Sequence, residues 1–402
     1  MNVAFIAQLL PVLQQTTGYI YPNELEVHWA LLIVLYPYLT GVVAGAFILA
    51  SLVKVFNIKE VQPTYRLSLL TALSFLLVAP LPLLLHLGHP GRSYEIFLTP
   101  NPSSAMAMFG FVYAWYLMVV LLLEIWFVYR RDLVMWAGRE KGPMKWIHKI
   151  MSLFSKDISD RAFKFDMKAI KVITIIGIPS AFLLHGYVGF IFGSIKANPW
   201  WSSVLMPIVF LFSAIVSGIA MVILIYMIIT PLRGKPIDMS CLDRVASYLF
   251  YAVIVDFSLE ALDFIHRLYE SEESIKILSE LVTGKLFSSL VVIQVFLGML
   301  IPLGIMSIIK MFTLDKELRK LLYFVSAILI QVGIFTTRWN VVIGGQMFSK
   351  SMRGLTTYKM EFWGLEGLLT TIGLLILPFV ILFVLLKILP PWGIKNGESV
   401  NQ

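Results

Sequence analysis

Long apolar stretches dominate the chain and predict its architecture. Each is long enough to cross about 30 Å of hydrocarbon, which takes roughly 20 residues of helix. Backbone polar groups cannot be left unpaired in lipid, so such stretches must be helical. The sequence therefore predicts an all-α, polytopic transmembrane helix bundle of about nine spans, with eight and ten as the limits. The stretches run approximately over residues 30–56, 64–87, 107–130, 170–195, 203–230, 243–267, 285–311, 319–338 and 364–388.

The positive charges between the stretches predict how the bundle is oriented. Of the 32 Lys and Arg residues, 23 lie in one alternating set of connections and 9 in the other. Because Lys and Arg are retained on the cytoplasmic side, the chain is expected to run N-out and C-in. This asymmetry also explains the formal net charge of +8, so no nucleic acid partner is indicated.

Composition agrees with an integral membrane protein. Hydrophobic residues make up 58% of the chain and charged residues 14%, against roughly 25% charged residues in an average soluble domain. The mean hydropathy is +0.83. Membrane lipid is therefore an expected partner along most of the chain.

The regions around the spans divide the chain further. Residues 1–28 contain no Lys or Arg and an apolar segment broken by Pro11, so we expect an outer-face interfacial segment without a cleavable leader. Residues 29–390 form the transmembrane domain, and residues 391–402 a cytoplasmic tail. Within the domain, the basic cytoplasmic loop 130–171 either lies as an amphipathic element on anionic headgroups or is a solvated loop with no partner.

Ionisable residues inside the spans are the main candidates for chemistry, since each costs about 2.5 to 3.5 kcal/mol on insertion scales. Asp256, Glu260, Asp263 and His266 fall within one face of the sixth span at 100° per residue. Such clustered carboxyl groups are suited to proton exchange, so we expect a proton path, continued inward by Glu124. The alternative is a structural network of hydrogen bonds and ion pairs with Arg338 or Lys196.

No resident metal, haem or iron–sulfur cluster is expected in this chain. The only cysteine is Cys241, whereas an iron–sulfur cluster needs about four ligands. Asp263 and His266 match half of a di-iron motif, but no other span supplies the second half. Paired haems need ligands in both leaflets, and five of the six histidines lie toward the outer side, which leaves a single outer haem as the alternative. Those histidines are His28, His86, His89, His185 and His266, while His148 is cytoplasmic.

Several polar residues are predicted to meet at the outer end of the bundle, beside the aromatic pair Trp200 and Trp201. A quinone requires donors for its carbonyl oxygens, a proton acceptor for the quinol, and apolar packing for its ring. The predicted quinone-binding residues are His28, His86, His185, Tyr187, Arg338 and Asn340.

Four segments together resemble the NrfD-like family, also called the polysulfide reductase membrane subunit family, and in particular its longer members from respiratory quinone-linked complexes. These segments are "HWALLIVLYPYLTGVVAGAFILASLV" (28–53), "LLLHLGHPGRSYEIFLTPNPSSAMAMFGFVYAWY" (83–116), "IPSAFLLHGYVGFIFGSIKANPWWSSVLMPIVFLFSAIVSGIA" (178–220) and "RWNVVIGGQ" (338–346). The last segment carries the family's arginine-x-asparagine motif at Arg338 and Asn340.

The resemblance implies a quinone-binding membrane subunit, with a menaquinone-type ligand, in a prokaryotic cytoplasmic membrane. It implies a ferredoxin-like iron–sulfur subunit on the outer face and, through it, a catalytic subunit with molybdopterin or a similar group, or a cytochrome. The expected partner interface comprises Lys196, Trp200, Trp201 and Gln346. Two alternatives remain: a proton- or ion-coupled transporter without a redox role, and a structural membrane anchor.

Overall fold

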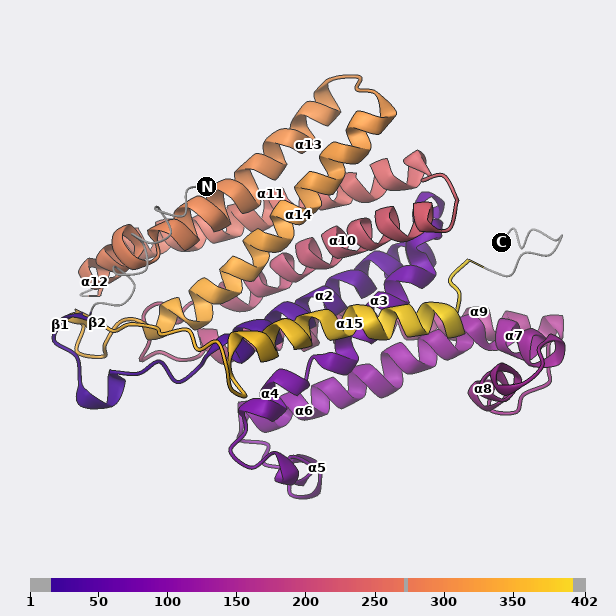
Figure 1. The fold of residues 1–402 in the computed structure, drawn as a ribbon, viewed down its shortest axis with the longest axis horizontal. Coiled ribbons are helices and arrows are strands. Elements are labelled where there is room, and N and C mark those ends of the chain that lie inside the picture. The colour runs from indigo at the N-terminus through magenta and orange to yellow at the C-terminus, as the bar shows by residue number, and fades with distance from the viewer. Residues whose placement is uncertain (1–15, 271–273, 393–402) are drawn as a thin grey trace.

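The computed structural model describes residues 16–270 and 274–392, and in this part of the chain nine helical spans are long and apolar enough to cross a membrane. The predicted multi-pass, all-α bundle and its count of nine spans are confirmed; the N-out orientation stays a prediction. Figure 1 shows the spans running between two ends of an elongated bundle, with β1, β2 and α12 at one end and α7 and α8 at the other. The spans are Leu31–Lys54, Lys59–His86, Ala107–Arg139, Asp160–Gly193, Met206–Leu232, Met239–Tyr269, Phe287–Met311, Lys316–Gln346 and Leu368–Ile388.

Some spans are built from more than one helical element. The α-helices are α2 (Leu31–Lys54), α3 (Tyr65–Val78), α4 (Leu81–His86), α5 (Glu95–Leu98), α6 (Ala105–Trp115), α7 (Leu123–Arg139), α8 (Pro143–Met151), α9 (Asp160–Gly193), α10 (Met206–Leu232), α11 (Met239–Glu270), α12 (Ile275–Glu280), α13 (Ile301–Met311), α14 (Lys316–Val342) and α15 (Leu368–Ile388). Wider π-helical turns form η4 (Tyr116–Leu122), η5 (Leu281–Lys285) and η6 (Phe287–Leu300). Short 3₁₀ turns form η1 (Pro22–Glu24), η2 (Lys59–Thr64), η3 (Pro90–Arg92) and η7 (Gly344–Gln346). One small antiparallel pair joins β1 (Thr17–Gly18) to β2 (Gly354–Leu355).

Helix α2 is the centre of the bundle and is buried along almost its whole length. It packs against α3, α9, α10 and α14. Its contact with α10 is backbone to backbone: a Cβ atom on Gly45 would lie 2.1 Å from the Ala214 carbonyl oxygen, and one on Gly218 would lie 2.4 Å from Gly45. Small residues at such contacts allow helices to approach closely in lipid.

Replacing Gly218 with Leu should therefore separate α2 from α10. Overpacking costs roughly 1 to 3 kcal/mol, and we expect the upper end because the clash is with backbone. Thermal unfolding, monitored by size-exclusion chromatography, measures the loss of stability. Gly373→Leu on α15 is the matched control, because a Cβ there meets nothing within 4 Å; an equal loss of stability in both variants would contradict the prediction.

The basic loop predicted over 130–171 is largely helical, because α7 continues to Arg139 and α9 already begins at Asp160. Arg130 and Asp166 form a buried ion pair at 2.6 Å, which ties the two helices together. Between them, α8 leaves Trp146 and Ile150 exposed, as expected for an amphipathic helix on a membrane surface. Its position on the headgroups stays a prediction, and most of the predicted segment 1–28 and of the tail 391–402 lies outside the described residues.

Candidate functional site

Arg338 forms the centre of a buried polar cluster between α14, α9 and α10. Its side chain is fully buried, and the guanidinium carbon lies 4.2 Å from the centre of the Phe210 ring. Nη2 donates to Ser213 Oγ at 2.5 Å and to His185 Nε2 at 3.2 Å. The arginine is thus positioned by His185 of α9 and by Phe210 and Ser213 of α10.

His185 is held in a defined tautomer by its neighbours. Nε2 accepts from Arg338, while Nδ1 lies 3.2 Å from the hydroxyl oxygen of Thr40. The single proton of the Thr40 hydroxyl points to the Tyr36 or Pro37 carbonyl, which lets the hydroxyl oxygen accept from His185 Nδ1. A neutral imidazole protonated at Nδ1 therefore satisfies both contacts.

The carboxyl groups of α11 line up beside this cluster. Asp256 and Glu260 are buried, and both interact electrostatically with the Arg338 guanidinium. Asp263 is one turn further out, where Arg267 Nε donates to it at 2.9 Å and Ser203 also donates to it. The predicted stripe thus runs from a fully buried carboxyl group to a partly exposed ion pair, while His266 is exposed.

A chain of side-chain amides links this stripe to Asn340. Gln294 Nε2 donates to Glu260 at 2.9 Å, and Asn340 Nδ2 donates to Gln294 Oε1 at 2.7 Å. Asn340 Oδ1 in turn accepts from Ser289 at 2.6 Å. Gln294 and Ser289 lie on the π-helical η6, a geometry that is frequent at functional sites.

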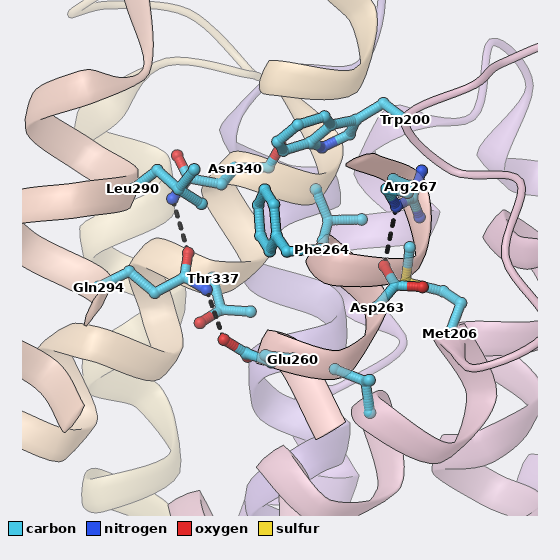
Figure 2. Close-up of a pocket in the computed structure, with 12 residues that line it drawn as sticks. Trp200, Met206, Glu260, Asp263, Phe264, Arg267, Leu290, Gln294, Thr337 and Asn340 are labelled. Carbon is cyan, nitrogen blue, oxygen red and sulfur yellow. Dashed lines mark hydrogen bonds and ion pairs between the residues drawn. The ribbon is translucent and has the colours of Figure 1, made fainter. Parts of the chain in front are cut away.

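Several of these groups, among them Glu260, Gln294 and Asn340, line a pocket with an open mouth. Figure 2 shows the Gln294–Glu260 pair and the Arg267–Asp263 pair on opposite sides of the Phe264 ring, with Trp200 above it. The pocket is lined by Trp200, Met206, Val209, Glu260, Asp263, Phe264, Arg267, Leu290, Gln294, Thr337, Asn340 and Val341. Apolar walls with a few convergent polar groups are typical of small-molecule sites.

Several buried polar atoms at this site have no hydrogen-bond partner among the described residues. They are Nε and Nη1 of Arg338, Oδ1 of Asp256 and Oε1 of Glu260. Because buried polar atoms are nearly always bonded, such atoms are expected to bond to water, an ion or a ligand.

The structure brings only part of the predicted quinone site together. His185, Arg338 and Asn340 belong to the connected region described above. Tyr187 lies two positions after His185 and so faces another side of α9, where its hydroxyl donates to the Ala105 carbonyl at 2.9 Å. His86 bonds to Glu366 at 2.9 Å, and His28 is exposed.

Glu124 lies in a separate polar cluster. It is fully buried, and its Oε1 accepts from Tyr65 at 3.1 Å and from Thr174 at 3.0 Å. Its other oxygen and the hydroxyl of Tyr116 have no hydrogen-bond partner within residues 16–270 and 274–392. No hydrogen bond observed in those residues joins Glu124 to Asp256, so a path through both would need intervening water.

Most of the residues predicted for the partner interface form hydrogen bonds within this chain. Trp200 and Trp201 are buried, and their indole N–H groups donate to the Asn340 and Val341 carbonyls at 2.9 and 2.6 Å. Gln346 bonds to the backbone N–H and carbonyl of Trp29. These contacts explain the apolar-to-polar change at "RWNVVIGGQ", and they leave Lys196 as the exposed member of the predicted interface.

The close approach of Trp201 to the segment after α14 also explains why residue 345 is a glycine. A Cβ atom on Gly345 would lie 2.0 Å from Trp201 Nε1, so no side chain fits there. Nearby, Lys285 donates to the Thr356 carbonyl at 2.5 Å and thereby docks the segment after η7 on the bundle. Burial lowers the pKa of this amine to about 8.

Ser213, Phe210, Gln294 and Ser289 belong to the site but do not follow from the sequence reasoning. Gln294 had a usable signal, since it is a lone amide in the apolar segment "LVVIQVFLG". The others are residue types found throughout these spans. In the part of the chain that the structure describes, no group of three or more His, Cys, Asp or Glu residues could hold a metal ion.

Fold and site together define a multi-pass membrane protein with a buried arginine–carboxylate centre near one end of the bundle. The chain matches the family described as "Polysulphide reductase, NrfD" over residues 22–350, and it therefore belongs to that family. The resemblance noted from the sequence is confirmed.

Three curated relatives are similar to the chain. A selenate reductase subunit of Mesobacillus selenatarsenatis is 31% identical over 321 residues, which is 78% of this chain and 73% of that protein. A protein of Halobacterium salinarum, named as a putative membrane subunit of dimethyl sulfoxide reductase, is 29% identical over 49% of this chain and 42% of its own length. Protein NrfD of Escherichia coli is 26% identical over 49% of this chain and 58% of its own length.

Proposed function

We propose that the chain is the quinone-binding membrane subunit of a respiratory reductase complex, which exchanges electrons between the membrane quinone pool and an iron–sulfur or cytochrome partner. Family membership and two relatives named as reductase subunits support this assignment. The observation that carries it is the buried Arg338, whose guanidinium has N–H groups without a partner among the described residues, next to a pocket that contains carboxyl groups.

The residues present fit a quinone. Phe264, Trp200 and Leu290 offer apolar surface to a ring. Asn340 and Arg338 provide N–H donors of the kind that bind a carbonyl oxygen. A menaquinone-type ligand, when bound, supplies the two-electron, two-proton chemistry.

The chain's own residues then hold the ligand and exchange its protons. Arg338 binds and orients an oxygen atom, in the position that Ser213 and His185 fix for it. Asp263, at the partly exposed end of the stripe, exchanges protons with the outer side, and the deeper carboxyl groups extend this route inward. Electrons pass to a ferredoxin-like subunit docked on the outer face near Lys196.

A transporter without a redox role or a purely structural anchor would bind no quinone, so a binding assay separates the alternatives. We expect the purified protein to bind a labelled menaquinone analogue that unlabelled quinone displaces. Gln294→Leu, which breaks the link between Glu260 and Asn340, should weaken binding about tenfold or more, consistent with the loss of a hydrogen bond to a charged group.

Gln331→Leu is the matched control. Gln331 is also a buried glutamine with two side-chain hydrogen bonds, to Tyr38 and to the Ser217 carbonyl, but it does not line the site pocket. Its variant should keep the wild-type affinity. Absence of displaceable binding in the wild-type protein would overturn the proposed function.

A further inference from the structure

A second cavity opens on the side of the bundle, away from the Arg338 site. It is a groove of about 1080 Å³, counting its open side, between α10, α14 and α15. In Figure 1, α14 and α15 diverge toward the end that carries α7 and α8, and α10 is seen between them. The lining is apolar apart from Gln331, and Ile328, Val332 and Phe383 remain exposed.

Each of the three helices has a cation about one turn beyond the groove: Lys320 and Lys387 lie within α14 and α15, and Arg233 is the residue directly after α10. Arg233 follows Ile229 of α10 by four residues, Lys387 follows Phe383 of α15 by four, and Lys320 precedes Phe324 of α14 by four. Residues four apart lie on the same face of a helix. The three cations therefore gather at one end of the groove, on the predicted cytoplasmic side.

Two of these cations are positioned by aromatic rings. The Arg233 guanidinium lies 3.3 Å from the centre of the Trp392 ring, and Lys387 Nζ lies 4.4 Å from the centre of the Phe383 ring. Lys320 is paired with Glu317 at 2.6 Å, whereas Arg233 and Lys387 have no carboxylate partner among the described residues. The end of the groove thus offers two uncompensated, positioned positive charges.

The depth of the groove matches one lipid leaflet. From Phe324 to Val332 the lining covers eight residue steps of α14, or about 12 Å at roughly 1.5 Å per residue. Half of the hydrocarbon core is about 15 Å. A molecule with a negative headgroup and an apolar chain of this length complements both the charge and the shape.

We propose that the groove between α10, α14 and α15 is a binding site for an anionic phospholipid of the inner leaflet. Its phosphate binds Arg233 and Lys387, and an acyl chain fills the groove as far as Gln331. Basic pockets between transmembrane helices on the cytoplasmic side bind such headgroups in membrane proteins generally. The site is independent of the quinone site proposed above.

The test measures the phospholipid retained by the purified full-length chain, by native mass spectrometry, and its exchange in nanodiscs of phosphatidylglycerol or phosphatidylcholine. We expect the wild-type chain to retain phosphatidylglycerol in preference. The double variant Arg233→Gln with Lys387→Gln should retain at least fivefold less, and Ile328→Trp should do the same by filling the groove.

Two matched controls separate this site from the general attraction of basic residues to the inner leaflet. Lys310→Gln removes another cation held over aromatic rings at the inner end of a helix, beside Phe250 and Tyr251 but away from the groove. Ile176→Trp adds the same bulk at a lipid-facing position of α9 that is 43% exposed, against 41% for Ile328. Both controls should retain the wild-type amount of lipid.

Equal losses in Lys310→Gln and in the double variant would overturn the proposal, as would equal retention of phosphatidylcholine. The proposal would also be overturned if the chain retained a quinone in the groove and the double variant retained the same amount. The groove would then bind an uncharged lipid tail. Because Arg233 and Lys387 are exposed, the double variant keeps the packing of the bundle and decides the matter even where Ile328→Trp assembles poorly.

Discussion

Replacing Arg338 with Lys is expected to lower quinone turnover at least 100-fold while the bundle still assembles. The guanidinium bonds to Ser213 and His185 through Nη2, stacks on Phe210, and has two further nitrogen atoms, Nε and Nη1, without a partner among the described residues. A lysine keeps the positive charge that faces Asp256 and Glu260, but it cannot fill these positions with one fixed planar group. Loss of one preorganised donor in an active site typically costs about 10²- to 10³-fold.

Quinol-dependent reduction of an artificial acceptor by the purified complex measures this effect, and size exclusion reports on assembly. Arg319→Lys is the control, because Arg319 pairs with Asp243 at 2.6 Å near the opposite end of α14, far along the chain from the site. Turnover at the wild-type level in the Arg338 variant would mean that the quinone reacts elsewhere in the protein.

The spans could be predicted from the sequence because the hydrocarbon core requires long runs of mostly apolar side chains on a helical backbone. The carboxylate stripe could be predicted in part for a related reason: a helix repeats about every 3.6 residues, so the spacing of Asp256, Glu260 and Asp263 fixes their common face. The electrostatic interaction of this face with Arg338 depends on where the packing of the bundle places α11 relative to α14, and the spacing of residues along one helix does not contain that information.

The same limit explains why some of the predicted quinone-binding residues lie away from the Arg338 cluster. His28, His86 and Tyr187 are predicted at the same membrane depth as His185, but depth does not determine the side of a helix on which a residue lies. Tyr187 is rotated by about 200° from His185 on the same helix and bonds elsewhere. Trp200 and Trp201 look like surface aromatics in sequence, and only the fold shows that their N–H groups bond to the end of α14.

Asparagine substitutions along the stripe should separate proton release from proton translocation. Asp263 is partly exposed and paired with Arg267, whereas Asp256 is buried and has an oxygen atom without a partner among the described residues. If protons of the quinone leave through the outer end, Asp263→Asn should slow turnover about 10- to 100-fold, the range of general acid–base assistance. Asp256→Asn should leave most of the turnover, because Asp256 lies deeper in the stripe than Asp263 and is not the group that exchanges protons at the partly exposed end.

The two variants differ in what they do to coupling. An amide keeps the shape and much of the hydrogen bonding of a carboxyl group but carries no exchangeable charge, so Asp256→Asn should lower the number of protons moved per electron while electron transfer continues. Proteoliposomes with an enclosed pH-sensitive dye measure both quantities in one experiment, with Asp243→Asn as a carboxyl control at the other end of α11.

The Glu124→Gln variant extends the test inward. Glu124 accepts hydrogen bonds from Tyr65 and Thr174 in a separate cluster, so this substitution should affect coupling only if water joins the two clusters. An unchanged proton-to-electron ratio in the Asp256 variant would make the inner part of the stripe a structural network that balances the charge of Arg338.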